Sequence, residues 1–126
     1  MSVSGASHRI QSELWHWAGI TSGPHRFGGV EFRLGRRELG HLHPTWADLP
    51  FTARIREMLL ETGRAEPHRA GVRGWVSVPL EDALPLFELS YERALIAQNV
   101  RASREQAGEA SGVDVPTGDD HPDPAA

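Results

Sequence analysis

The stretch of sequence that decides the fold runs from residue 27 to residue 43 and reads FGGVEFRLGRRELGHLH. Two arms of mixed apolar and polar residues flank Gly35, a pattern typical of a β-hairpin with a two-residue type II′ turn. This turn sets Arg33 directly opposite Glu38 on the facing strands. Their opposite charges favour this register over a one-residue slip.

The same register places two histidines, His41 and His43, on one face of the second arm, because alternate residues of a strand point to the same side. It sets His41 opposite Val30 and gives both histidines the apolar face, which they share with Phe32. Glu38 lies on the other face and is therefore a poor candidate for a shared metal site. Buried imidazoles need partners, so we expect a pocket where the two histidines emerge.

The composition limits the function classes. The chain has 126 residues, no cysteine and a net charge of −4, so disulfides, thiolate metal sites and a cysteine nucleophile are excluded. Residues 106–126 are acidic, lack apolar periodicity and are predicted to be a disordered tail. We expect a flexible stretch over 1–7, one domain over 8–98, and the end of a helix followed by the tail over 99–126. No apolar run is long enough to span a membrane, and a cytoplasmic location is expected.

The remaining elements follow from periodicity and turn residues. They are a helix from a cap at Ser7 to Gly19, a loop over 44–50, a helix ended by Gly63, short strands over 64–69 and 75–79, and a last helix from Glu81. The order helix, strand, strand, helix, strand, strand, helix predicts an α+β fold. Its antiparallel sheet would have about four strands in two hairpins, with helices packed on one face.

A third histidine, His68, stands at the end of a predicted strand and can reach the same pocket. Three imidazoles allow three interpretations. They can bind zinc or non-haem iron. They can be core residues that stack on Trp46 or Trp75 and bond to backbone. They can also exchange protons with a substrate, since histidine titrates near neutrality. We favour the third interpretation and predict no metal ligand.

The chain resembles the small bacterial luciferase-domain proteins, which share a domain with fungal luciferase, over roughly residues 24–96 and most clearly within 24–43 and 63–68. The similarity to the fungal enzyme is concentrated at Glu38, at the three histidines, at Trp75 and along the last helix. The resemblance implies an oxygenase reaction without a cofactor, in which oxygen adds to a hydroxylated pyrone and carbon dioxide leaves. The chain is shorter than the fungal enzyme, and Arg33 stands where the fungal strand carries a histidine.

We assign the site on this basis. His41 or His43 would take a proton from the substrate, His68 would orient the anion, and Trp75 would cover the ring. The predicted catalytic residues are thus His41, His43 and His68, and the predicted substrate contacts are Trp75, Arg33, Phe32 and Trp46. The expected partners are a small planar aromatic or pyrone-like molecule and molecular oxygen, with a homodimer left open and no membrane contact.

Two alternatives from other function classes remain. The chain can be a non-catalytic binding module for a small ligand or for nucleic acid, similar to the YjbR-like proteins, with Arg33, Arg36 and Arg37 contacting phosphate. Against nucleic acid, the chain without its acidic tail has a charge near +1, from the total of −4 and the five acidic residues of 106–126. The other alternative is a metal-binding domain.

Overall fold

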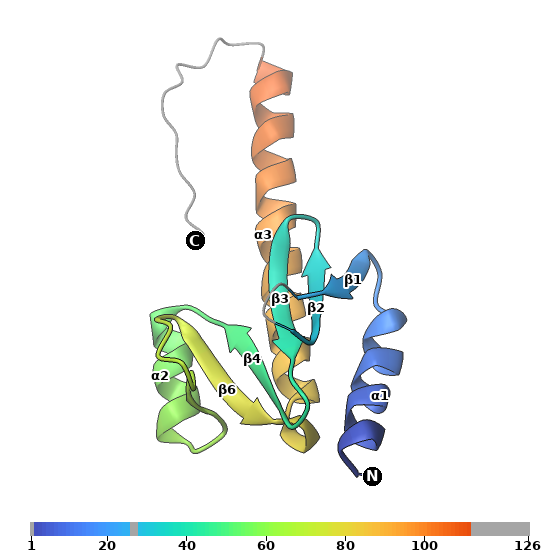
Figure 1. Cartoon of the computed structure of the whole chain (residues 1–126). Coiled ribbons are helices and arrows are strands. Elements are labelled where there is room, and N and C mark those ends of the chain that lie inside the picture. The colour runs from blue at the N-terminus through green and yellow to red at the C-terminus, as the bar shows by residue number, and fades with distance from the viewer. Residues whose placement is uncertain (1, 26–27, 112–126) are drawn as a thin grey trace. The chain divides into compact units, whose positions relative to one another are not determined.

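The structure is a computed structural model that describes residues 2–25 and 28–111 (Figure 1). Within these residues the order is helix, four strands, helix, two strands, helix, which confirms the α+β class. The elements are α1 Ser2–Trp15, β1 Ile20–Pro24, β2 Val30–Leu34, β3 Arg37–Leu42, β4 Trp46–Pro50, α2 Ala53–Glu61, β5 Glu66–Pro67, β6 Trp75–Pro79, the 3-10 helix η1 Leu80–Asp82, and α3 Leu84–Ser111.

The antiparallel sheet in the described chain has six strands in the order β1-β2-β3-β4-β6-β5. The prediction of about four strands in two hairpins was therefore wrong. The two additional strands are β1, which follows the first helix, and β4, which occupies the predicted loop over 44–50. Strand β4 lies inside the sheet, where its backbone pairs with β3 on one side and with β6 on the other.

The tip of the β2–β3 hairpin agrees with the sequence. Gly35 has a φ of 64°, as the first central residue of a type II′ turn requires, and Arg33 lies opposite Glu38 as predicted. Beyond this pair the register shifts, because Phe32 faces Gly40 instead of Leu39. Leu39 is thus the extra residue of a β-bulge.

The bulge reverses which side of β3 each later residue faces. His41 pairs with Glu31, not with Val30 as predicted, and its face is the polar one. The placement of both histidines on the apolar face with Phe32 was therefore wrong, because the extra residue at Leu39 shifts the alternation by one. For the same reason Glu38 lies on the face of the histidines, and its exclusion from their surroundings was also wrong.

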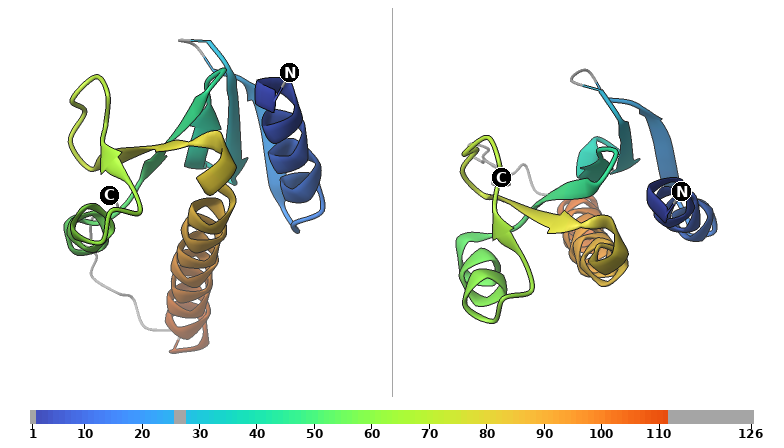
Figure 2. Two further views of the ribbon diagram at one scale, coloured as in Figure 1. Left: turned by 90° about the horizontal axis from the view of Figure 1, so that it is seen from below. Right: turned by 60° about the horizontal axis from the view of Figure 1, so that its bottom comes forward.

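The core lies on the opposite side of the sheet from the histidines. Phe32 is 1 % exposed and meets the ring of Phe87 edge to face, with 5.7 Å between the ring centroids. The backbone oxygen of Leu39 accepts a hydrogen bond from Ser90 Oγ of the same helix. The first turns of α3 therefore cover this face, and in the left view of Figure 2 they lie below the strands together with α2. The histidine face of the sheet is left open.

The helices agree with the sequence in part. α2 begins after Thr52, whose side chain accepts from Ile55 N, and it ends before Gly63, which has a φ of 75°. α1 begins at Ser2, so the predicted cap at Ser7 was wrong: Ser7 lies inside the helix and bonds to Gln11.

The chain divides into two compact units, Met1–Leu95 and Ile96–Ala126, and α3 contributes to both. In the second unit the helix continues to Ser111, past the predicted start of the tail at residue 106. The rest of the predicted tail, residues 112–126, lies outside the described residues. Within the described residues no helix is both long enough and apolar enough to cross a membrane.

Candidate functional site

The open face of the sheet carries a pocket of about 960 Å³, which we call the histidine pocket. Strands β2, β3, β4 and β6 supply its floor, and the segment after β5 closes one side. The residues that line it are Pro24, His25, Glu31, Arg33, Glu38, His41, His43, Trp46, Asp48, His68, Arg69, Ala70, Val72 and Trp75. Aromatic and ionisable side chains together form most of this lining.

The deepest polar group of the pocket is Asp48, which is 2 % exposed at the centre of β4. Its Oδ1 accepts a hydrogen bond of 2.6 Å from Ser77 Oγ, on the facing residue of β6. Its Oδ2 lies 3.3 Å from His41 Nε2, 2.8 Å from His43 Nε2 and 3.4 Å from His68 Nε2. The three predicted histidines are therefore brought together by one carboxylate that the sequence did not single out.

His41 lies between two carboxylates. Its Nδ1 is 2.7 Å from Glu38 Oε2, and because an ionised carboxylate only accepts, Nδ1 carries the hydrogen of this bond. Burial alone would lower the pKa of His41, but the hydrogen bonds to Asp48 and Glu38 outweigh burial and raise it to about 9. The β-bulge makes this possible, because it brings residues three apart in sequence to the same face.

The pKa of Asp48 is shifted in the opposite direction. Burial would raise it, but hydrogen bonds from His41 and Ser77 outweigh burial and lower it to about 2. Asp48 is therefore ionised at neutral pH. The floor of the pocket therefore combines the negative charge of Asp48 with the positive charge of His41.

His68 has a defined tautomer. Its Nδ1 accepts hydrogen bonds from the backbone nitrogens of Ala70 (3.1 Å) and Val72 (3.3 Å). Because Nδ1 is an acceptor, the hydrogen of the neutral ring is on Nε2, the atom that faces Asp48. The N–H of His68 therefore faces the carboxylate at 3.4 Å.

Two tryptophans form the aromatic walls. Trp46 stacks on His43 with 4.4 Å between the ring centroids, and the guanidinium of Arg69 lies 4.5 Å above the Trp46 ring. Trp75 lies 5.3 Å from the ring of His41 and 6.2 Å from that of His68. The polar floor is thus bordered by flat apolar surfaces on two sides.

A fourth histidine, His25, stacks on His41 with 3.8 Å between the ring centroids. Burial lowers the pKa of His25, and the neighbouring charge of His41 lowers it further. A neutral imidazole therefore covers a charged one at the β1 side of the pocket. The sequence offered no signal for His25, since it lies just after β1, which was itself not predicted.

The structure brings together six of the seven predicted site residues: His41, His43, His68, Trp75, Trp46 and Arg33 all line the pocket. The exception is Phe32, which is buried in the core against Phe87 and does not reach the pocket. Arg33 forms an ion pair with Glu31, two residues away on the same face of β2. The residues missed by sequence reasoning are Asp48, Ser77, His25 and the wrongly excluded Glu38.

Two groups in the described part of the chain have the spacing of cation ligands. One is His41, His43 and Asp48, and the other is His25, Glu38 and His41, with the ligand atoms of each group within 4.8 Å of one another. The first group is the more buried, with His41 at 6 % and Asp48 at 2 % exposed.

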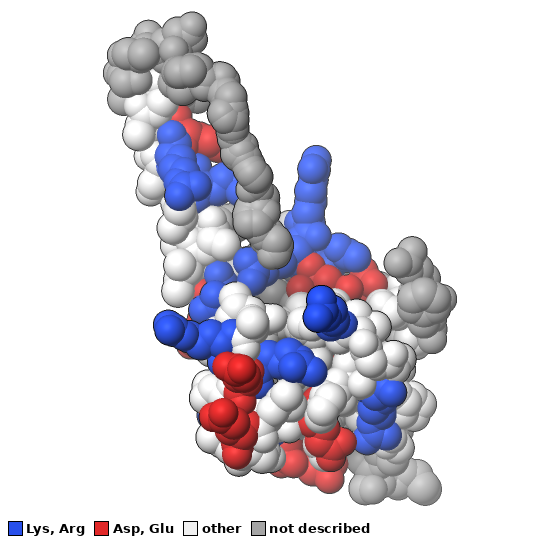
Figure 3. Space-filling model, turned by 90° about the vertical axis from the view of Figure 1, so that its left-hand side faces the viewer, with Lys and Arg blue, Asp and Glu red and all other residues white. Residues whose placement is uncertain are grey.

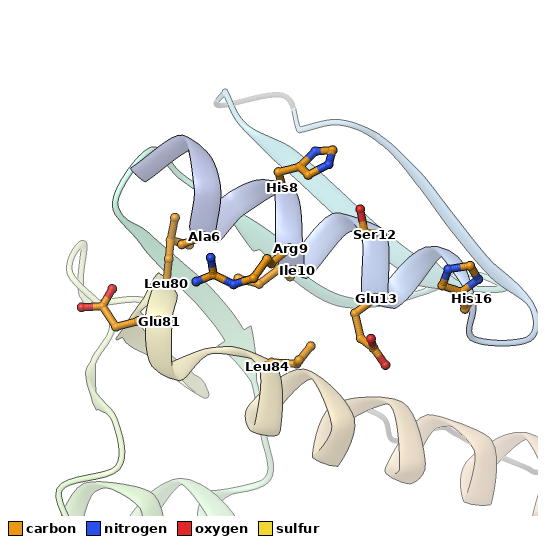
Figure 4. A pocket seen from close by; sticks show the side chains of 10 residues that line it. All are labelled: Ala6, His8, Arg9, Ile10, Ser12, Glu13, His16, Leu80, Glu81 and Leu84. Atoms are coloured by element: carbon orange, nitrogen blue, oxygen red, sulfur yellow. The ribbon is translucent and has the colours of Figure 1, made fainter. Parts of the chain in front are cut away.

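A second pocket, of about 430 Å³, lies between α1 and the start of α3 (Figure 4). Apolar side chains such as Ile10 and Leu84 form its base, and Arg9 and Glu13 reach its edge. His8 lies on α1 and His16 lies just after this helix. Among the described contacts, neither histidine forms an ion pair with a carboxylate, unlike the histidines around Asp48. The histidine pocket is therefore the stronger candidate for chemistry.

Comparison with known proteins identifies the segment that builds this site. Residues 36–84 match the family model of the Luciferase domain, which confirms the resemblance predicted from the sequence. No curated protein and no solved structure matches the chain.

Proposed function

We propose that the chain is an enzyme that binds a planar hydroxylated ring of the hydroxy-pyrone type in the histidine pocket and promotes its reaction with molecular oxygen. The observation that carries this proposal is that the segment matching the Luciferase domain overlaps with the residues that line the pocket. The segment that matches the Luciferase domain, residues 36–84, contains most of the pocket lining, from Glu38 on β3 to Trp75 on β6. The segment that matches the Luciferase domain therefore supplies most, but not all, of the pocket lining.

The shape of the pocket suits a flat ring. A cavity of about 960 Å³ falls in the range of small-molecule sites, and apolar walls with a few convergent polar groups are typical of them. Trp46 and Trp75 offer ring faces against which a planar substrate can stack. Its hydroxyl group would then point toward His41, His43 and Asp48 on the floor.

The chemistry of the floor suits a substrate that must ionise before it reacts. Loss of the hydroxyl proton gives an enolate-type anion, whose electron-rich ring carbon forms a bond to oxygen; carbon dioxide then leaves. The cluster of imidazoles around Asp48 takes up the proton, and the positive charge on His41 stabilises the anion. His41 itself is protonated and held by two carboxylates, so the charge-stabilising role suits it better than the predicted role of base.

The charge distribution favours a small molecule over nucleic acid as the partner. On the face shown in Figure 3, basic and acidic side chains are interspersed and form no continuous basic surface. The histidine pocket also contains Glu31, Glu38 and Asp48. These carboxylates would repel a phosphate backbone.

The direct test is turnover of a hydroxy-pyrone luciferin in air. We expect substrate loss and oxygen uptake, measured by mass spectrometry and an oxygen electrode, with photon counting as an additional readout. His41→Ala and His43→Ala should each lower the rate about 100-fold or more. The far-UV circular dichroism should stay unchanged for His43→Ala, since its side chain is less buried than that of His41. His16→Ala, at an exposed residue just after α1, is the matched control and should keep the wild-type rate.

Two results would contradict the proposal. One is the absence of both substrate loss and light with the folded wild-type chain. The other is a folded His43→Ala variant that retains the wild-type rate, since the pocket floor would then take no part in the reaction.

A further inference from the structure

The contacts of Asp48 Oδ2 exceed what hydrogen bonding alone can satisfy. Three Nε2 atoms, from His41, His43 and His68, lie within 3.4 Å of this one oxygen. A carboxylate oxygen offers about two lone pairs. His68 turns an N–H toward this oxygen at 3.4 Å, because its tautomer places the hydrogen on Nε2. His41 Nε2 and His43 Nε2 approach the same oxygen, and only His43 forms a normal hydrogen bond with it.

The orientation of His41 sharpens this point. Its Nδ1–H is directed to Glu38, so in the neutral ring Nε2 carries a lone pair and faces the carboxylate. A lone pair and an anionic oxygen 3.3 Å apart repel each other unless positive charge lies between them. A proton on Nε2 supplies that charge in the absence of an ion. A metal ion can replace the proton at the same position.

We propose that the histidine pocket binds a divalent first-row transition-metal ion through His41 Nε2, His43 Nε2 and Asp48 Oδ2. Metal–ligand bonds of about 2.0–2.2 Å place neighbouring ligand atoms about 3.0–3.4 Å apart. The two nitrogens lie 3.3 and 2.8 Å from Asp48 Oδ2, and all three ligand atoms lie within 4.8 Å of one another, so the side chains would have to close on the ion by about 1.5 Å at most. Imidazole and carboxylate donors together suit zinc and iron.

The groups around these three residues orient them as in known metal sites. A metal-bound histidine usually donates its other ring N–H to a carboxylate, and His41 does so to Glu38 at 2.7 Å. The second oxygen of Asp48 is held by Ser77 at 2.6 Å. The ring of His43 is fixed by stacking on Trp46. Each ligand therefore has its own supporting contact.

The proposed ligands all approach from the floor of the pocket. Two histidines and one carboxylate on one side of an ion leave positions open on the other side, the arrangement of non-haem iron oxygenases. Here the open side faces the cavity between Trp46 and Trp75. Contact between the ion and a substrate oxygen rests on the proposed function, whereas binding of the ion does not.

The test uses the full-length chain without a tag, treated with a chelator and then dialysed. Calorimetric titration with Zn²⁺ should show one ion per chain. Co²⁺ should give visible absorption bands of a protein-bound ion. His43→Ala and Asp48→Asn should weaken Zn²⁺ binding more than about 100-fold, and Glu38→Gln about 10–100-fold. His43 is less buried than His41, so its variant is the one expected to fold.

Two controls separate this site from adventitious binding by histidine. His16→Ala, which removes an exposed histidine just after α1, should bind Zn²⁺ like the wild type. His68→Ala should weaken binding but leave the positions of the Co²⁺ bands unchanged, because the N–H of His68 faces Asp48 and His68 is not a ligand.

The proposal is overturned if the wild-type chain binds no Zn²⁺, or if a folded His43→Ala variant binds it equally well. A shift of the Co²⁺ bands in His68→Ala would overturn the assignment of three ligands. These measurements contain no substrate, so their failure leaves the proposed oxygenation standing. Failure of turnover with intact Zn²⁺ binding would contradict only the proposed function.

Discussion

Replacing Gly40 by alanine is expected to lower the free energy of unfolding by about 3 kcal/mol or more. A Cβ at this position would lie 2.8 Å from Phe87 Cε1 and 2.9 Å from both the backbone oxygen of Asp48 and Leu49 Cγ. Gly40 also has a φ of 155°, which side-chain-bearing residues rarely adopt. The added methyl group must therefore push α3 away from the sheet or open the bulge that positions His41.

Urea unfolding followed by circular dichroism would measure this loss. Gly23→Ala is the matched control, since Gly23 is a strand glycine of the same sheet whose added Cβ would meet nothing within 4 Å. We expect the control to stay within about 0.5 kcal/mol of the wild type. An equally small effect of Gly40→Ala would contradict the close packing of Phe87 on β3.

The same glycine explains where the sequence-based register failed. The turn at Gly35 and the pair Arg33–Glu38 could be predicted, because turn geometry and facing charges are local properties. The bulge at Leu39 could not, since Leu39 and Gly40 fit a regular strand equally well. The residue after the bulge, Gly40, lies against Phe87, more than 40 residues later, and against Asp48 and Leu49 of a strand that was not predicted. Contacts that distant in sequence leave no periodicity to detect.

Strand β4 was missed for a related reason. The strand begins two residues after Pro44 and ends at Pro50, and its five residues are too few to establish a pattern on their own. One signal was present, because Asp48 is flanked by the apolar residues Ala47 and Leu49. A lone acid at an alternating position of this kind suggests a buried carboxylate. Its partners come from β3, β6 and the segment after β5, so only the assembled sheet identifies them.

The grouping of the histidines was nevertheless predictable. The spacing of His41 and His43 is enough to place them on one face whether or not a bulge precedes them. Which face they occupy depends on the bulge, and that part of the prediction failed. The sequence could thus predict that a site exists, but not that Glu38 and Asp48 complete it.

Replacing Asp48 by alanine is expected to have the largest effect at the site, a loss of about 3–5 kcal/mol of unfolding free energy at neutral pH. The substitution removes the carboxylate that His41, His43 and His68 approach, and it leaves the Ser77 hydroxyl without its acceptor. The positive charge on His41 would keep only Glu38 as a counter-charge. An uncompensated charge at a residue only 6 % exposed is costly.

Asp48→Asn removes the negative charge of the side chain but keeps its shape, so it separates the two contributions to stability. The amide oxygen can still accept from Ser77, so we expect a smaller loss of stability than with alanine, but the same loss of Zn²⁺ binding and of turnover, because both depend on the negative charge. Glu57→Gln, an exposed acid on α2, is the control for charge removal and should stay within about 0.5 kcal/mol of the wild type. Chemical unfolding of the three variants would measure these losses of unfolding free energy. If Asp48→Ala is as stable as Glu57→Gln, the carboxylate does not hold the histidines together, and the common centre of the site is lost with it.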